Sequence, residues 1–219
     1  MKINLLLAIL SFLVFLVFTV YSYAVAKELY QKIDFDTAVK LQDHISRRWD
    51  GFFSYFSLIG SAEVTFFISG LFALLALLRL KWKVFLGWLI IIPASFFEIF
   101  GKLFLYHPGP PKFLHRSLIS TNLPSFYVHT DYSYPSGHMT RTIFLLTVFL
   151  IIVLASRKNF VSKQLLAGLL ISFGFLMFMT RVYLGEHWLS DVIGGTLLGL
   201  ASGLFASSLI LPKKKSVDV

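Results

Sequence analysis

The hydrophobic residues of this chain fall in long continuous blocks, and the length of these blocks limits its fold more than any other feature. An α-helix needs about 20 apolar residues to cross the hydrocarbon core of a bilayer. The chain has six blocks close to that length: 3–26, 53–78, 84–106, 138–155, 165–183 and 190–211. The charged connections between them are too short to hold a soluble domain. We therefore predict an all-α fold, in which residues 1–219 form a single six-helix integral membrane bundle.

Composition excludes several classes of function. Hydrophobic residues make up 57% of the chain, more than a soluble domain carries. Because cysteine is absent, disulfide bonds and thiolate metal sites are excluded. The formal net charge of +9 would suggest nucleic-acid binding in a soluble protein. Here the basic residues lie beside the apolar blocks and form no basic face with stacking aromatic residues, so we expect no nucleic-acid partner.

The first block is longer than the core of a signal peptide and has no clear cleavage site after it. We expect it to be retained as a span, with a cleaved signal peptide as the alternative. The segment 27–50 that follows is charge-balanced and carries a loose amphipathic stripe. This pattern predicts a short helix at the membrane surface between spans one and two, with Trp49 at headgroup depth.

The distribution of Lys and Arg predicts the orientation of the bundle. Alternate connections are rich in these residues, which lie on the cytoplasmic side of multi-pass cell membrane proteins. They are Lys2, Arg79, Lys81, Lys83, Arg157, Lys158, Lys163 and Lys213–Lys215. We therefore expect both termini to be cytoplasmic, and the loops 107–137 and 183–190 to lie on the outer, extracytoplasmic side.

Ionisable and polar residues gather at the predicted outer ends of the last four spans. Charges at membrane depth are costly, so they usually have a function. The residues at these ends are Glu98, Lys102, Ser136, Gly137, His138, Arg181, Glu186, His187 and Asp191. Glu63 falls inside the second block and faces either the bundle interior or an interface.

His187 and Asp191 are four residues apart, which on a helix puts them on one face. A carboxylate beside an imidazole fixes its tautomer and leaves the other ring nitrogen free to attack an electrophile. The same pair could instead only cap a helix. We interpret it as a candidate nucleophile pair.

Pro135-Ser136-Gly137-His138 comes directly before an apolar block. Backbone N–H groups at a helix start, together with the helix dipole, bind anions. His138 would lie within reach of an anion bound there. An ordinary turn is the other interpretation of this tetrapeptide.

Lys102 and Arg181 lie near the outer ends of two spans, where such side chains often only reach for the headgroups. Beside two histidines and a helix start, convergence on a phosphate explains them better. Arginine offers a planar fork to phosphoryl oxygens, and lysine offers a point charge.

Together these residues resemble the three-part signature of the type 2 phosphatidic acid phosphatase (PAP2) superfamily, in its membrane lipid phosphatase branch. That signature reads K-x6-R-P, P-S-G-H and S-R-x5-H-x3-D. The chain supplies Lys102, then Pro135 to His138, then Thr180-Arg181-x5-His187-x3-Asp191. The resemblance covers residues 55–205, and the order, the gaps and the placement at span ends agree with it.

The chain departs from the signature at two positions. Thr180 replaces the usual serine and keeps a hydroxyl group. Gly109 stands where the first motif has arginine, so one phosphate ligand is missing at that register. Lys112 or Arg116, later in the same loop, could supply the lost charge.

The resemblance implies a role for each matched residue. His187, oriented by Asp191, would attack phosphorus and form a phosphohistidine. His138 would protonate the leaving oxygen and then activate water. The residues expected to hold the phosphoryl oxygens are Lys102, Arg181, Ser136 and Gly137. No metal and no cofactor is expected, and we interpret His107, His115 and His129 as loop residues.

We therefore expect a metal-independent phosphatase acting on a lipid phosphate or pyrophosphate that enters from the bilayer. Candidate substrates are phosphatidylglycerol phosphate, phosphatidic acid and a polyprenyl pyrophosphate. The rivals are a catalytically impaired family member that binds lipid or serves as a scaffold, which Gly109 favours, and a transporter. Glycines in the last block permit close helix packing, so an oligomer is conceivable but not indicated.

Overall fold

The computed structural model describes residues 3–119 and 132–212, and within these ranges the chain contains helices and no strand. The α-helices are α1 Ile3–Ala26, α2 Gln31–His44, α3 Asp50–Ser57, α4 Ala62–Leu78, α5 Trp82–Leu89, α6 Ile91–Phe104, α7 Gly137–Ala155, α8 Phe160–Tyr183 and α9 Leu189–Ile210. Short 3-10 turns lie between them: η1 Arg47–Trp49, η2 Leu58–Gly60 and η3 Lys112–Leu114. The predicted all-α class is confirmed.

Six helical stretches of the described chain are long and apolar enough to cross a membrane, which confirms the predicted number of spans. They are Ile3–Ala26, Arg47–Leu78, Trp82–Phe104, Gly137–Ala155, Phe160–Tyr183 and Leu189–Ile210. The second stretch begins earlier than predicted and is interrupted at η2, where Ser61 caps α4 by accepting a hydrogen bond from the Val64 N–H at 3.4 Å.

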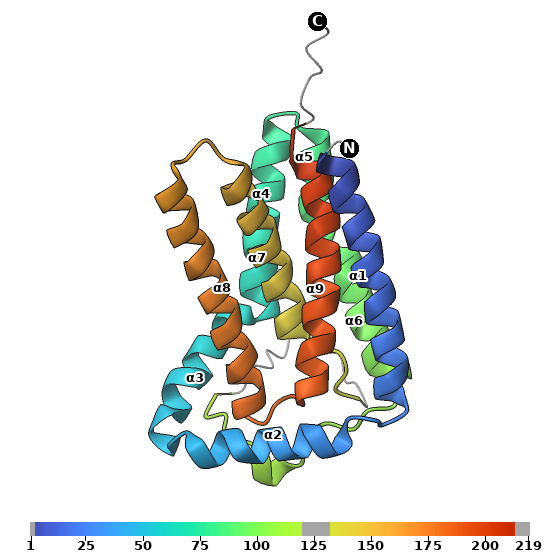
Figure 1. The fold of residues 1–219 in the computed structure, drawn as a ribbon, viewed down its shortest axis with the longest axis vertical. Helices are drawn as coiled ribbons and strands as arrows, with labels where there is room; N and C mark the ends of the chain where they lie inside the picture. The colour runs from blue at the N-terminus through green and yellow to red at the C-terminus, as the bar shows by residue number, and fades with distance from the viewer. Residues whose placement is uncertain (1–2, 120–131, 213–219) are drawn as a thin grey trace, which may run out of the picture.

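The helix expected between the first two spans is α2, and it lies across one end of the bundle (Figure 1). We call this end the α2 end. The opposite end holds the start of α1 and the end of α9. The buried face of α2 consists of Asp34, Ala38 and Gln42, whereas Ile33 and Phe35 are exposed. The buried face of α2 is therefore largely polar, and Ile33 and Phe35 lie among the mostly charged and polar residues of its exposed face.

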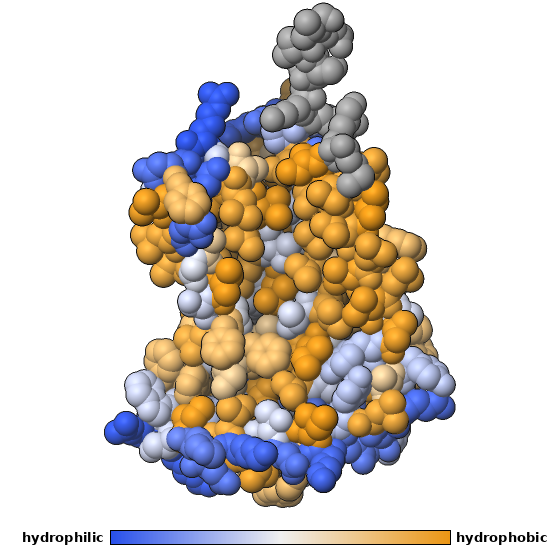
Figure 2. All heavy atoms as spheres, in the orientation of Figure 1, coloured by the Kyte–Doolittle hydropathy of each residue, from blue (hydrophilic) through white to orange (hydrophobic). Residues whose placement is uncertain are grey.

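The lateral surface of the bundle is apolar. Figure 2 shows hydrophobic side chains over the middle of the visible face, with hydrophilic residues gathered toward the two ends. Large apolar side chains such as Phe12, Phe67 and Phe175 are exposed on α1, α4 and α8. Because a surface of this kind is stable only in a hydrocarbon environment, the chain is a multi-span membrane protein.

Helices α7 and α9 pack closely through glycines of α9. A Cβ added at Gly195 would lie 2.4 Å from the Ser136 carbonyl oxygen, and one at Gly199 would lie 2.5 Å from that of Thr140. The glycine stripe noted in the sequence therefore serves packing within the bundle. It also brings the start of α7 against the start of α9.

Glu63 lies in the first turn of α4 and is half-buried.

Candidate active site

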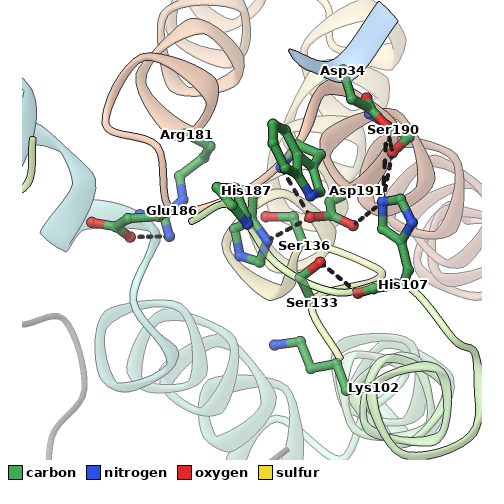
Figure 3. Close-up of polar contacts among 12 residues, drawn as sticks. Asp34, Lys102, His107, Ser133, Ser136, Arg181, Glu186, His187, Ser190 and Asp191 are labelled. Carbon is green, nitrogen blue, oxygen red and sulfur yellow. Dashed lines mark hydrogen bonds and ion pairs between the residues drawn. The ribbon is translucent and has the colours of Figure 1, made fainter. Parts of the chain in front are cut away.

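The residues singled out in the sequence meet at the α2 end of the bundle. Lys102 lies in the last turn of α6, and Arg181 in the last turn of α8. Ser136 precedes α7, whose first two residues are Gly137 and His138. His187 and Asp191 lie at the junction of α8 and α9. Figure 3 shows Lys102, Ser136, Arg181, His187 and Asp191 grouped there, with the side chains of Lys102 and Arg181 on either side of His187.

His187 and Asp191 form the expected contact, but not in the expected way. The ring Nδ1 of His187 lies 3.2 Å from Asp191 Oδ2 (Figure 3). His187 precedes α9 instead of lying on it, so the prediction that both residues share a helical face was wrong. The same carboxylate oxygen accepts a hydrogen bond from the Trp188 N–H at 3.0 Å. Asp191 therefore caps α9 and orients the imidazole at once.

The imidazole of His187 is held neutral. Burial, followed by the positive charges of Arg181 and Lys102, holds the pKa of His187 well below its ordinary value, and Glu186 and Glu98 offset this only in part. With the Nδ1 proton directed to Asp191, the Nε2 lone pair is free. This is the protonation state that a nucleophilic or basic histidine requires.

Arg181 is buried and has one partner on α3 and one in the loop between α8 and α9. Its guanidinium donates to Ser57 Oγ of α3 and forms an ion pair with Glu186 (Figure 3). Burial alone would raise the pKa of Glu186, but the positive charge of Arg181, together with hydrogen bonds from Ser117 and Arg181, outweighs it and the pKa is lowered. The ion pair therefore stays charged at neutral pH.

A second charged cluster surrounds Glu98, which is 4% exposed. Lys102 Nζ donates to Glu98 Oε1 at 2.9 Å, and Arg141 Nη1 donates to Glu98 Oε2 at 2.5 Å. A Cβ added at Gly137 would lie 2.0 Å from Glu98 Oε1, so this carboxylate lies directly against the first residue of α7. The helix start that the sequence suggested as an anion site therefore has a carboxylate beside it.

Sequence reasoning missed Arg141, which lies one turn after His138 on α7. The available signal was a charged residue inside an apolar block, immediately after the second motif.

Several buried polar atoms at this end have no hydrogen-bond partner among the described residues. They are Arg116 Nε, Ser136 Oγ, His138 Nε2, Arg141 Nε, Thr142 Oγ1, Arg181 Nε and Asp191 Oδ1. A polar group left unpaired in the interior costs about 1–3 kcal/mol. A cluster of such groups with three cations nearby is suited to a bound anion.

His107 also belongs to this cluster, although its position suggested only a loop residue. It is 3% exposed, and its Nε2 lies 3.0 Å from Ser190 Oγ and 3.5 Å from Asp191 Oδ1 (Figure 3). Ser190 in turn donates from its N–H and its hydroxyl to Asp34 of α2, at 2.8 and 2.7 Å. These contacts link α2 to the carboxylate that orients His187. His115 contacts the Pro110 carbonyl at 3.2 Å, and His129 lies outside the described residues.

Neither expected substitute for the missing motif arginine contacts the described site residues. The Arg116 guanidinium donates to the carbonyls of Gln42 and Ile45 at 2.9 and 3.1 Å, and to the Tyr183 hydroxyl at 3.2 Å. It therefore fastens α2 to the end of α8. Lys112 lies in the exposed part of η3 and forms no side-chain hydrogen bond within the described ranges.

Gly109 lies close to the site. The Trp188 indole N–H donates to the Pro108 carbonyl at 2.8 Å, which brings position 109 beside the residue that follows His187. A Cβ added at Gly109 would meet only Ser133, at 3.5 Å. Packing therefore does not demand glycine at this position.

Two relatives of known name match part of the chain. A phosphatidylglycerophosphatase B of Haemophilus influenzae is 36% identical over 106 residues, which cover 44% of this chain and 41% of that protein. An undecaprenyl-diphosphatase of Sulfolobus acidocaldarius is 40% identical over 70 residues, covering 32% of this chain and 30% of that protein. The matches thus span less than half of each relative.

Two solved structures share the fold over most of their length. A PAP2-type phosphatidylglycerolphosphate phosphatase from Bacillus subtilis superposes with a TM-score of 0.68 at 20% identity, covering 89% of this chain and 92% of the other. Aquifex aeolicus LpxE superposes with a TM-score of 0.56 at 24% identity, covering 80% and 94%.

The model of the PAP2 superfamily matches residues 82–215, more than half of the chain. This region contains all three motifs, His187 with its oriented imidazole, and the buried cations around it. The sequence, the fold and the arrangement at the α2 end agree, and the chain belongs to the PAP2 superfamily.

Proposed function

We propose that this protein is a membrane phosphatase that hydrolyses the phosphate monoester or pyrophosphate of a lipid through a phosphohistidine intermediate. One observation carries the proposal above the rest: a buried neutral imidazole, oriented by Asp191, lies beside the cations Arg181 and Lys102. Membership of the PAP2 superfamily and the names of the relatives support the same activity.

The reaction proceeds in two displacements. His187 Nε2 attacks phosphorus, the bond between phosphorus and the lipid oxygen breaks, and His138 gives its proton to that leaving oxygen. His138 then takes a proton from water, whose oxygen attacks the phosphohistidine. The bond between nitrogen and phosphorus breaks, inorganic phosphate leaves, and both histidines return to their starting states.

Protein cations stabilise the charge that builds on the phosphoryl oxygens. Lys102 and Arg181 supply full positive charges, and the start of α7 at Ser136 and Gly137 supplies backbone N–H groups. Because these groups surround the reacting phosphate, the reaction needs no divalent metal and no cofactor. Asp191 holds His187 in the reactive tautomer throughout.

The substrate is a lipid phosphate or pyrophosphate that reaches the α2 end from the bilayer. Phosphatidylglycerol phosphate, phosphatidic acid and a polyprenyl pyrophosphate are the three candidates. The names of the relatives include a phosphatidylglycerophosphatase and an undecaprenyl-diphosphatase, which favours the first and third of them equally.

The α2 end faces the outer side of a cell membrane, and both termini are cytoplasmic. The distribution of charge supports this orientation. Arg79 and Lys81 follow α4, and Arg157 and Lys158 follow α7, all at the end opposite α2. Such residues are retained in the cytoplasm during insertion. Lys213–Lys215 lie outside the described residues.

A catalytically impaired protein that only binds lipid phosphate is the alternative, because Gly109 removes a motif cation. A transporter is disfavoured because the buried charges lie at one end of the spans, whereas transport sites lie near the midplane. Retention of His138, His187 and Asp191 favours turnover.

Phosphate release from purified protein separates these alternatives. The wild type, His187→Ala and the control His44→Ala are assayed with the three lipid substrates in excess chelator. We expect release by the wild type and the control, and a loss of about a thousandfold or more in His187→Ala. Activity that requires a divalent metal, or that survives in His187→Ala, would contradict the mechanism. Phosphate binding without turnover in the wild type would support the impaired protein instead.

A further inference from the structure

We propose that Arg141 supplies the phosphate-binding guanidinium that the first motif lacks at Gly109, and that Glu98 occupies the phosphate cradle until substrate displaces it. This inference rests on the proposed phosphatase function. It assigns a substrate-binding role to one residue and a counter-ion role to another, neither of which belongs to the three motifs.

Arg141 is placed for this role by the helix that carries His138. The two residues are three positions apart on α7, so their side chains leave the helix on the same side. Arg141 is 8% exposed. A guanidinium at this depth in a membrane protein needs a partner of opposite charge, and its partner is Glu98.

The Glu98 carboxylate stands where a phosphoryl group would bind. It accepts hydrogen bonds from Lys102 at 2.9 Å and from Arg141 at 2.5 Å, and it lies against Gly137 at the start of α7. Lys102 and the start of α7 are also the groups expected to hold phosphoryl oxygens. A carboxylate and a phosphate are bound by the same cationic side chains. Glu98 therefore behaves as an internal anion in the cradle.

A structural ion pair alone does not account for this cluster. Two cations contact a single carboxylate, which leaves one positive charge in excess. Arg141 Nε is buried and has no hydrogen-bond partner among the described residues, and the same is true of the nearby His138 Nε2. A phosphate dianion would supply both the missing negative charge and the missing acceptors.

Neither of the other basic residues in the loop takes the place of the missing arginine, because Lys112 is exposed on η3 and Arg116 is bound elsewhere. The Arg116 guanidinium is hydrogen-bonded to Gln42, Ile45 and Tyr183. Position 109 itself has room for a side chain, since a Cβ there would meet only Ser133 at 3.5 Å. Packing therefore does not explain why position 109 lacks an arginine. We infer that Arg141 on α7 supplies the guanidinium in its place.

The first test measures affinity for inorganic phosphate and for orthovanadate, together with kcat and KM for a lipid phosphate. Arg141→Gln removes the guanidinium, and Arg116→Gln is the matched control. We expect Arg141→Gln to weaken anion binding and raise KM by about tenfold to a hundredfold. Arg116→Gln should change anion affinity by less than about twofold, although it lowers the melting temperature. Unchanged anion affinity and KM in folded Arg141→Gln would overturn the inference.

The second test restores the motif arginine. Gly109→Arg is combined with Arg141→Gln, and the double variant should recover most of the anion affinity lost in Arg141→Gln. A residue needed only for folding would not be rescued by an arginine placed on another element. A double variant that binds phosphate no better than Arg141→Gln would overturn the assignment of Arg141 to the role of position 109.

The third test concerns Glu98 and does not depend on the folding of Arg141 variants. Glu98→Gln keeps the shape of the side chain and removes its charge. If Glu98 competes with substrate for the cradle, the variant should bind inorganic phosphate several times more tightly than the wild type. Equal or weaker binding would mean that Glu98 is only a structural partner.

These outcomes are distinguishable from a failure of the proposed function. Wild-type protein that releases phosphate from lipid, with Arg141 variants unchanged, overturns only the inference. Wild-type protein that neither binds phosphate nor releases it overturns the proposed function, and the inference with it.

Discussion

Among single residues, Asp191 has the strongest influence on the chemistry of His187. It is fully buried, and its Oδ2 accepts hydrogen bonds from the His187 ring and from the Trp188 N–H. Because the carboxylate also caps α9, its position is fixed by the helix itself. The imidazole is thereby held in one tautomer with Nε2 directed away from the carboxylate.

Replacing Asp191 with asparagine should preserve the shape of the site and remove the charge. We expect kcat to fall by about a thousandfold to ten-thousandfold, because the amide no longer favours the reactive tautomer. KM should change little, since the phosphate cations remain. Steady-state kinetics of Asp191→Asn test this, with the exposed Asp36→Asn as control. An equal loss in both variants, or a loss confined to KM, would contradict the role of Asp191.

The lowered pKa of His187 predicts the pH dependence of phosphoenzyme formation. The ordinary value for histidine is 6.5, and burial with neighbouring cations lowers it. Above the lowered pKa the imidazole is neutral and can attack, so the step should stay fast as pH falls through 6.5. Single-turnover rates measured between about pH 5 and 8 report this limb.

The same shift affects stability. Between the lowered pKa of His187 and 6.5 the unfolded chain binds more protons than the folded protein, so the contribution of His187 to stability decreases as pH falls through this window. In the kinetic experiment, a rate of phosphoenzyme formation that is already half lost near pH 6.5 would contradict the neutral imidazole.

The motifs predicted most residues of the site, because their spacing fixes which helix ends carry them. Arg141 and His107 were not predicted. The sequence shows that Arg141 lies inside an apolar block, but it does not show that Glu98 is its partner. His107 reaches Asp191 only because the loop after α6 folds back over α9, and such long-range contacts leave no local pattern.

Among the helices, it is the close contact between α7 and α9 that positions His138 and His187. The contact depends on glycine, because added side chains would meet backbone atoms that cannot move aside. At Gly199 a Cβ would lie 2.5 Å from the Thr140 carbonyl oxygen and 2.9 Å from Ile143 Cβ. This contact, further along the two helices, keeps the starts of α7 and α9 close together.

Gly199→Leu should separate these helices. We expect a loss of about 1–3 kcal/mol in stability, seen as a lower melting temperature, and a fall in kcat as His138 moves relative to Asp191. Gly168→Leu on α8 is the matched control, because a Cβ there meets nothing within 4 Å. Unchanged melting and activity in Gly199→Leu would show that the packing does not position the site.

Helix α2 is fastened to the site through a buried carboxylate. Burial raises the pKa of Asp34 to about 6, although hydrogen bonds from Ser190 act in the opposite direction and Asp191 adds to the rise. Because the folded pKa lies above the ordinary value of 3.8, the folded protein binds more protons between these two pH values. The contribution of Asp34 to stability therefore decreases as pH rises from about 4 to about 6.

Asp34→Asn should remove this dependence. The difference in melting temperature between the wild type and Asp34→Asn should shift in favour of the variant as pH rises from about 4 to about 7. Thermal unfolding in detergent across this range measures it, with Asp36→Asn as control. A difference that is constant with pH would contradict the raised pKa of Asp34.

Spans were predictable at this scale, whereas their interruptions were not. Long apolar blocks identify helices whatever their partners, but the break at η2 depends on Ser61 capping a new helix within one block. The position of His187 outside α9 follows from the same kind of local capping, by Asp191. Capping contacts need side-chain geometry that spacing alone does not specify.

The two ends of the whole molecule differ in charge, and this difference supports the proposed orientation. The site, α2 and the loop after α6 lie at one end, and the basic connections after α4 and α7 lie at the other. The six apolar blocks and the positions of the basic residues predicted that the site and the basic connections lie at opposite ends. Substrate identity was not predictable, because no motif in the sequence distinguishes the three candidate lipids.

The absence of native cysteine makes the orientation directly measurable. Single cysteines at Lys112 in η3 and at Arg157 after α7 are labelled in whole cells with a membrane-impermeant maleimide. We expect Lys112→Cys to react in intact cells and Arg157→Cys only after permeabilisation. The reverse pattern would invert the orientation and place the site in the cytoplasm.

In the proposed reaction His187 carries the phosphoryl group during turnover. The most direct test is to mix purified protein with a phosphate-labelled lipid, quench within the first turnover at alkaline pH, and map the label by mass spectrometry. We expect an acid-labile phosphoryl group on His187 in the wild type and no labelled protein in His187→Ala. Label on any other residue, or turnover by direct transfer to water with no labelled protein, would contradict it.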